Sequence, residues 1–265
     1  FNDVSPARHR GEGPPTTEIQ AERLTDLVRY NRIEGLYTGL GLAYHGNNRY
    51  PGFEYHLLGG YAWAERRIRA RMSLELKHGR WNYAFRAGSV LDNTNDFRNP
   101  FDSAGTIGGF FGSDRYDYVS RGFALASAQH DLFAGDGRLR IESGYMRDEA
   151  TTNHVRWSPI RGKMFLANRD IQVGGYVRTQ IVYQWHPNTT AEFMGTGWGA
   201  QLKYLRGDGD VTFQRVELRL NERVNRGPWT FAGRFDAGTM LGSDFPPQYL
   251  FEVGNESGLT GYDYK

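Results

Sequence analysis

The sequence contains no cysteine, which limits the chemistry open to it. Without cysteine it can form no disulfide framework, no cysteine-based zinc site and no thiol nucleophile. The sequence also lacks a long uninterrupted apolar run, so it contains no transmembrane helix. A transmembrane β-strand needs apolar residues only at alternate positions, and these absences therefore leave a membrane β-barrel open.

Strong net charge and catalytic motifs are also missing. The 32 basic and 30 acidic residues give a formal net charge of +2, which does not indicate a nucleic-acid partner. No G-x-S-x-G nucleophile motif, Walker phosphate loop or H-E-x-x-H metal motif is present. The seven histidines are scattered without the spacing of a metal site. We therefore expect no enzymatic activity, no cofactor and no metal.

Glycine and aromatic residues are abundant, which favours strands and turns over a helical bundle. Glycine contributes 34 of the 265 residues, and 14% are aromatic. Beyond the N-terminal segment, apolar and polar residues alternate with a period of two, as in a strand with two unlike faces. Residues 67–77 show this most clearly, with Ile68 and Leu74 on one face and Arg69 and Glu75 on the other.

Ten segments carry this alternation, and no helical segment interrupts them. They lie at 32–45, 52–64, 67–78, 81–91, 117–130, 138–149, 171–186, 190–206, 210–222 and 228–241. Most reach the roughly 9–11 residues that a tilted strand needs to cross a bilayer. The sequence predicts an all-β fold, an antiparallel meander of transmembrane β-barrel strands over residues 32–241. Residues 1–31 are expected to form a polar lead-in that could hold a short helix.

The connections between these segments alternate between short and long. The long ones, at 92–116, 150–170 and 242–265, all follow even-numbered segments, so they would share one edge of the sheet. Outer-membrane barrels show this asymmetry, with long loops outside and short turns on the periplasmic side. We therefore expect the three long connections to be extracellular.

Aromatic residues fall near the opposite, short-turn edge, on the apolar faces of their segments. They are Tyr44, Phe53, Trp81, Trp185 and Trp229. A girdle of aromatic rings at one bilayer interface predicts this clustering, whereas the core of a soluble sandwich would spread them along the strands. We expect a location in the bacterial outer membrane with lipid as a partner. A soluble sugar-binding β-sandwich is the least favoured alternative.

The polar faces of the segments would line the lumen of such a barrel, where charged side chains stay hydrated. The residues predicted to face the lumen include Arg67, Arg69, Arg71, Arg178, Arg234 and Asp236. One interpretation is a basic lumen that favours anions. The other, which we favour, is a set of arginine–carboxylate ladders that keep the barrel rigid.

Two stretches of the sequence are similar to one known family. The first, YNRIEGL at 30–36, resembles the opening barrel segment of bacterial surface-antigen proteins of the BamA/TamA superfamily. The second, PPQYLF at 246–251 followed by SGLTGY at 257–262, resembles the long-loop motif of that superfamily. The motif normally holds an apolar residue, Arg, Gly and an aromatic residue. The corresponding residues here are Leu259, Thr260, Gly261 and Tyr262, so Thr260 stands where the family has its lumen-contacting Arg.

The resemblance implies both an architecture and a function. It implies that the chain is an incomplete part, about 10–11 strands, of a 16-strand barrel, and that the loop 242–265 folds into the lumen. It further implies a non-catalytic role in membrane-protein insertion or translocation, with other envelope proteins or the remaining strands as partners. A passive pore with a basic lumen and a structural barrel subunit of a larger envelope complex are the alternatives.

Overall fold

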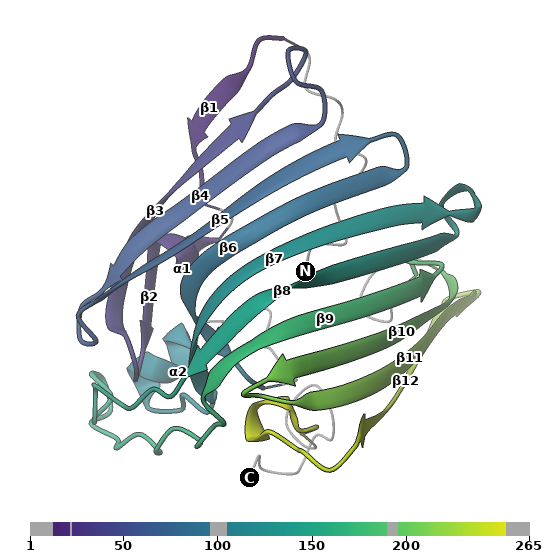
Figure 1. Ribbon diagram of the computed structural model, residues 1–265. Helices are drawn as coiled ribbons and strands as arrows, with labels where there is room; N and C mark the ends of the chain where they lie inside the picture. The colour runs from purple at the N-terminus through teal and green to yellow at the C-terminus, as the bar shows by residue number, and fades with distance from the viewer. Residues whose placement is uncertain (1–12, 22, 96–104, 190–195, 253–265) are drawn as a thin grey trace.

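The computed structural model describes residues 13–21, 23–95, 105–189 and 196–252 (Figure 1). Its ten long strands are β3 (Gly35–His45), β4 (Phe53–Ala62), β5 (Arg67–His78), β6 (Trp81–Asn93), β7 (Tyr118–Leu132), β8 (Gly137–Glu149), β9 (Gly174–Trp185), β10 (Gly197–Gly209), β11 (Phe213–Arg226) and β12 (Trp229–Leu241). They follow one another across one sheet in chain order, each antiparallel to the next. The prediction of an all-β antiparallel meander is confirmed.

Two short strands complete the sheet at the free edge of β3. These are β1 (Thr16–Ile19) and β2 (Val28–Asn31), with the single-turn helix α1 (Leu24–Leu27) between them. Both strands pair with β3, so this part of the expected lead-in is an edge strand interrupted by one helical turn. Segments of four residues are too short to show a clear alternation, so neither strand was predicted from the sequence.

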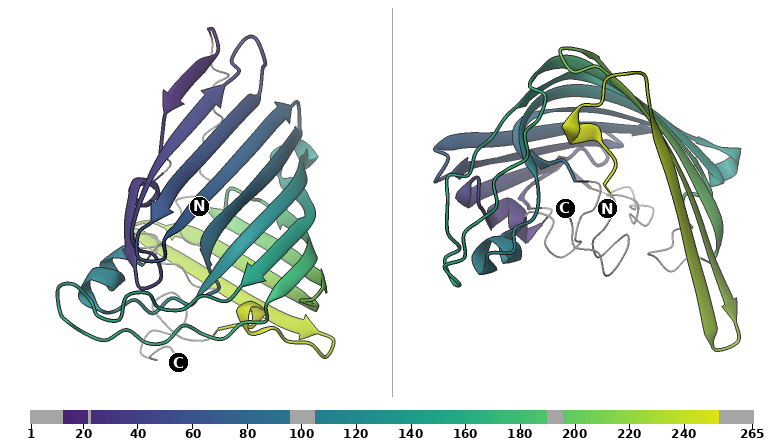
Figure 2. Two further views of the ribbon diagram at one scale, coloured as in Figure 1. Left: turned by 60° about the vertical axis from the view of Figure 1, so that its left-hand side comes forward. Right: turned by 90° about the horizontal axis from the view of Figure 1, so that it is seen from below.

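The sheet is strongly curved and does not close on itself in the described part of the chain. No ladder joins β12 to β1, β2 or β3. The curvature gives the sheet a concave side, which residues 242–252 enter, and a convex side (Figure 2). An open curved meander of this kind is consistent with part of a barrel.

The long connections meet at one end of the sheet. The helix α2 (Thr106–Phe111) and the segments around it, residues 150–173 and residues 242–252 all lie there (Figure 1). Glu252 joins them, because it accepts hydrogen bonds from Asn95 at 2.8 Å and Arg169 at 3.0 Å. Within the described ranges, no helix is both long and apolar enough to cross a membrane.

The buried apolar side chains pack together mainly on the concave side of the sheet. One cluster joins five strands and two connecting segments, and it consists of Leu125, Met146, Tyr176, Leu205, Val211, Phe213 and Tyr249. A smaller cluster of Ile33, Tyr116 and Tyr118 lies beneath the loop end. Most other large apolar side chains are on the opposite, convex face. The convex face of the sheet therefore exposes apolar side chains, whereas a soluble β-protein buries such a face.

Candidate functional site

The convex face exposes large apolar side chains on nearly every long strand. Cross-strand register places them together, for example Leu42 opposite Leu57 and Ile141 opposite Ile181. The exposed residues on this face include Leu40, Leu42, Leu57, Ile68, Leu76, Tyr83, Phe85, Ile141, Tyr145, Val177, Ile181, Leu202, Leu220, Phe231 and Phe235. A contiguous apolar surface of this extent marks contact with a membrane or with another protein.

All five aromatic residues singled out in the sequence lie at the short-turn end of this face. Tyr44 and Phe53 pack edge-on, with ring centroids 6.1 Å apart. Trp185 stacks with Trp198 at 6.4 Å. Trp81 and Trp229 begin β6 and β12, and Trp229 is 69% exposed. The structure thus gathers these rings into a row at one end of the sheet, and Trp198 extends the predicted set.

The concave face carries the charged residues, and the central ones form an ion-pair network. Arg86 on β6 and Arg178 on β9 both bind the carboxylate of Glu142 on β8. Glu142 is only 1% exposed. Because β7 lies between β6 and β8, this carboxylate connects strands that share no ladder. The arrangement agrees with the favoured arginine–carboxylate interpretation.

The three predicted arginines of β5 each reach a carboxylate. They are Arg67, Arg69 and Arg71, and their partners are Glu149 at 2.9 Å, Glu65 at 2.5 Å and Asp26 at 3.3 Å, respectively. Only Glu149 belongs to another long strand, because Glu65 lies in the preceding turn and Asp26 in α1. Alternation in the sequence places the arginines on one face but does not reveal partners that come from turns.

The remaining two predicted residues lie at the open edge of the sheet. Asp236 on β12 accepts a hydrogen bond from Nε of Arg219 at 2.7 Å and also binds Arg234. These side chains are 31–45% exposed, in contrast to the buried carboxylate of Glu142. Arg234 and Asp236 are thus brought together with each other but not with the predicted residues of β5.

A buried polar centre on the concave face was not anticipated from the sequence. Arg121 on β7 donates to both carboxylate oxygens of Asp148 on β8, at 2.8 and 2.9 Å. The Tyr176 hydroxyl donates to the same carboxylate at 3.0 Å and hydrogen-bonds with the Tyr249 hydroxyl. Arg121 is 8% exposed and Asp148 1%. Arg121 and Asp148 lie outside the stretches with the clearest alternation, and Tyr249 comes from a distant loop. The sequence pattern therefore did not bring these residues together.

The described part of the last loop docks onto this centre. The Tyr249 ring stacks on Phe213 with centroids 3.8 Å apart, and its carbonyl accepts a hydrogen bond from Arg215 at 2.8 Å. Gln248, 3% exposed, donates to the Gln172 carbonyl at 2.7 Å. Burial raises the pKa of Tyr249, so its hydroxyl remains protonated. Gln248 and Tyr249 therefore anchor the loop here, and the motif residues 259–262 lie outside the described residues.

The first stretch that carries the family resemblance forms a buried turn. The Asn31 side chain accepts backbone hydrogen bonds from Ile33 at 3.0 Å and Glu34 at 2.8 Å. Arg32, 1% exposed, lies 3.1 Å from a carboxylate oxygen of Asp114 in the segment after α2. Burial raises the pKa of Asp114, and the nearby Arg32 only partly offsets this effect. The turn fastens the loop end to the sheet.

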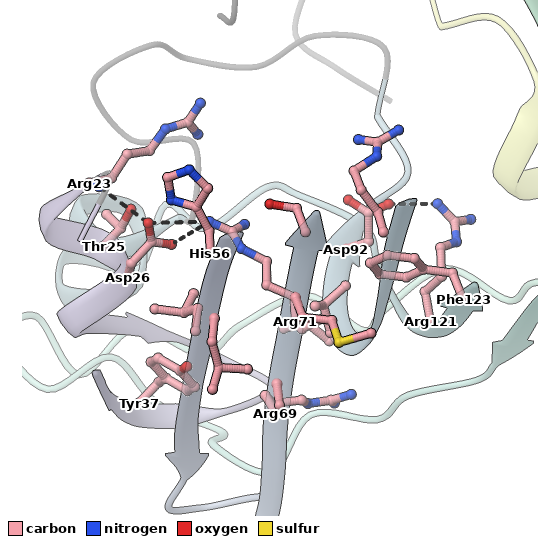
Figure 3. Close-up of a pocket in the computed structure, with 18 of the residues that line it drawn as sticks. Arg23, Thr25, Asp26, Tyr37, His56, Arg69, Arg71, Asp92, Arg121 and Phe123 are labelled. Atoms are coloured by element: carbon pink, nitrogen blue, oxygen red, sulfur yellow. Dashed lines mark hydrogen bonds and ion pairs between the residues drawn. The ribbon is translucent and has the colours of Figure 1, made fainter. Parts of the chain in front are cut away.

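A cavity of about 420 Å³ opens on the concave face beside α1. Figure 3 shows Arg71 reaching Asp26 and Arg121 reaching Asp92 at its margin. Arginine is the most frequent residue type in its lining, and both carboxylates and apolar side chains accompany the arginines, so part of the cavity wall is charged. Within the described residues, no group of three His, Asp or Glu side chains could hold a metal ion.

Comparison of the chain with protein-family models, curated proteins and solved structures finds no match. Function must therefore be inferred from the chemistry of the two faces. The convex face can contact an apolar medium, and the concave face can hold water and charge. The docked residues Gln248 and Tyr249 cover part of the concave face near the loop end.

Proposed function

We propose that this chain forms most of a transmembrane β-barrel in a bacterial outer membrane. The single observation that carries the proposal is the segregation of the two faces, with exposed apolar side chains outside and paired charges inside. A hydrocarbon environment stabilises the first face, and a water-filled lumen hydrates the second. Paired strands also satisfy their backbone groups internally, as the membrane interior requires.

The dimensions of the strands support this environment. β5 has 12 residues and β7 has 15. At about 3.3 Å per residue and the usual tilt, such strands exceed the roughly 25 Å apolar band of a membrane barrel. The aromatic row at the short-turn end would then lie at one bilayer interface. The long connections would lie at the other, which we assign to the extracellular side.

We further propose a non-catalytic role in membrane-protein insertion or translocation. The resemblance of residues 30–36 and 246–262 to the surface-antigen superfamily supports this role, and so does the loop anchored on the concave face. The same loop, together with the Glu142 network, occupies space that an open anion pore would need. An occupied lumen therefore favours an assembly role over passive conduction.

Two measurements test this proposal. Cysteine placed at the exposed positions Ser113, Thr152 or Ser243 should react with an impermeant maleimide on intact cells, whereas cysteine at Asp136 in a short turn should react only after lysis. Depletion of the complete protein should leave other outer-membrane proteins unassembled in the periplasm. Labelling of Asp136 on intact cells would reverse the orientation. Normal assembly of the other barrels would exclude the insertion role and favour a pore or a structural subunit.

A further inference from the structure

The sheet divides between β5 and β6 at the loop end. The β5–β6 ladder stops at the pair Ala70–Ser89, although β5 begins at Arg67 and β6 continues to Asn93. Each strand keeps its ladder with its other neighbour to those limits. The two strands therefore diverge here, as Figure 1 shows. We call this feature, bounded by residues 67–69 and 90–93, the β5–β6 split.

Two arginines of β5 bridge the split with side-chain contacts in place of ladder hydrogen bonds. Arg69 donates to the Ser120 hydroxyl on β7 at 2.8 Å and to Glu65 at 2.5 and 2.7 Å. Arg69 is 1% exposed, and its Nε atom has no hydrogen-bond partner among the described residues. Arg67 reaches farther, to Glu149 on β8. The split is thus held by cationic side chains.

The outer rim of the split has more positive than negative charge. Glu149 lies between two arginines, 2.9 Å from Arg67 and 3.4 Å from Arg147. Its side chain and that of Arg67 are each 41% exposed, and that of Arg147 is 63% exposed. One carboxylate cannot neutralise two guanidinium groups, so an additional anion would be attracted to this rim. Guanidinium groups bind phosphate oxygens in a bidentate manner.

An apolar surface borders this cationic rim on the convex side. Ile68, between the two bridging arginines in sequence, is 72% exposed. Tyr61 lies opposite Ile68 in the ladder, and Trp63 packs edge-on against Tyr61 at 5.2 Å. Trp63 is 56% exposed. A cationic rim beside an apolar, aromatic surface complements a molecule with an anionic head and a hydrocarbon tail.

We propose that the rim of the β5–β6 split binds an anionic lipid. Arg67 and Arg147 hold its phosphate-bearing head group, and its acyl chain lies over Ile68 and Trp63. The proposal rests on the proposed function, because the convex face must lie in lipid. The apolar border selects a lipid over free phosphate.

The test uses the complete barrel purified in mild detergent and mixed with equal amounts of phosphatidylglycerol and phosphatidylcholine. Native mass spectrometry should show preferential retention of phosphatidylglycerol. Arg67→Gln and Arg147→Gln should each weaken this preference about fivefold, the usual contribution of one basic residue near anionic lipid. Arg234→Gln removes an exposed arginine at the distant open edge and should leave the preference unchanged.

Several results would overturn the lipid site. Equal retention of the two lipids would do so, as would a preference that survives Arg67→Gln and Arg147→Gln together. Displacement of phosphatidylglycerol by inorganic phosphate at equal concentration would show an anion site with no lipid component. Membrane fractionation and heat-modifiable gel mobility report whether the barrel is assembled in the membrane. They therefore distinguish failure of the lipid site from failure of the proposed function. A barrel that is assembled in the membrane but unselective contradicts the lipid site alone, whereas a wild-type chain absent from the membrane contradicts the proposed function.

Discussion

At the residue scale, Glu142 holds together the central charges of the concave face. It is almost fully buried and binds Arg86 and Arg178 from different strands. Removing its charge leaves two arginines facing each other with no carboxylate between them. Breaking a buried pair is costly because the remaining charges stay poorly solvated.

Glu142→Gln should therefore lower the free energy of unfolding of the complete barrel. We expect a loss of roughly 2–4 kcal/mol, below the full cost of a buried pair because Arg86 is 42% exposed. Urea unfolding followed by tryptophan fluorescence measures the change. Asp236→Asn, at an exposed pair, is the matched control and should cost less than about 1 kcal/mol. Equal losses in the two variants would contradict the network.

Asp114 gives the stability of the loop end a pH dependence that is opposite to the usual one for an aspartate. Its pKa is raised in the folded protein, so folding favours the protonated carboxyl. The stability that this group contributes is present below its unfolded pKa of about 3.9 and is lost as the pH rises through the folded pKa. Lowering the pH from neutral should therefore stabilise the wild-type loop end relative to Asp114→Asn.

Limited proteolysis of the segment that follows α2 measures this difference. The ratio of cleavage rates, variant over wild type, should increase as the pH is lowered from about 7 towards 4. Comparison with the variant at each pH removes the contribution of all other titrating groups and of the protease itself. A ratio that falls on acidification would show that the ion pair with Arg32 outweighs burial.

At the element scale, the loop after β12 is anchored by Tyr249. Its ring stacks on Phe213, and its hydroxyl joins Tyr176 beside Arg121. Tyr249→Ala should release the loop, making residues 242–252 sensitive to protease, while the strands remain assembled. Tyr249→Phe keeps the ring and should lose only the hydroxyl contact, typically about 1 kcal/mol. If residues 242–252 stay protected from protease in the alanine variant, Gln248 alone is enough to hold the loop in place.

Strand positions were predicted well where alternation is strict and less well where the flanking loops also alternate. The predicted segment 67–78 coincides with β5, in which polar and apolar residues alternate strictly from Arg67 to Lys77. The segment 171–186 was placed too early, because Ile171 and Val173 continue the alternation of β9, which begins at Gly174. β1 and β2 were not detected because four residues carry too little pattern.

The candidate site was only partly predictable, for a physical reason. Alternation places Arg69 and Arg71 on one face, but their partners Glu65 and Asp26 lie in turns whose positions depend on the folded chain. Tyr249 reaches the centre through a loop that crosses the concave side. The β5–β6 split depends on where a ladder ends, which no local pattern encodes.

At the scale of the whole molecule, the proposed function depends on which medium the convex face contacts. Leu74 and Glu75 are neighbours on β5 whose side chains point to opposite faces. In the ladder, Leu74 lies between Tyr55 and Phe85 on the convex side, whereas Glu75 lines the concave cavity. A substitution at each position therefore compares the two environments at nearly the same depth.

The most direct test is the membrane assembly yield of Leu74→Arg and Glu75→Arg in the complete barrel. An arginine on the lipid side near the middle of the bilayer costs roughly 2–4 kcal/mol, whereas one in a hydrated lumen costs little. Heat-modifiable gel mobility of isolated outer membranes measures the folded fraction. We predict strong loss of assembled barrel for Leu74→Arg and near wild-type yield for Glu75→Arg. Equal yields for the two variants would contradict a lipid-embedded convex face.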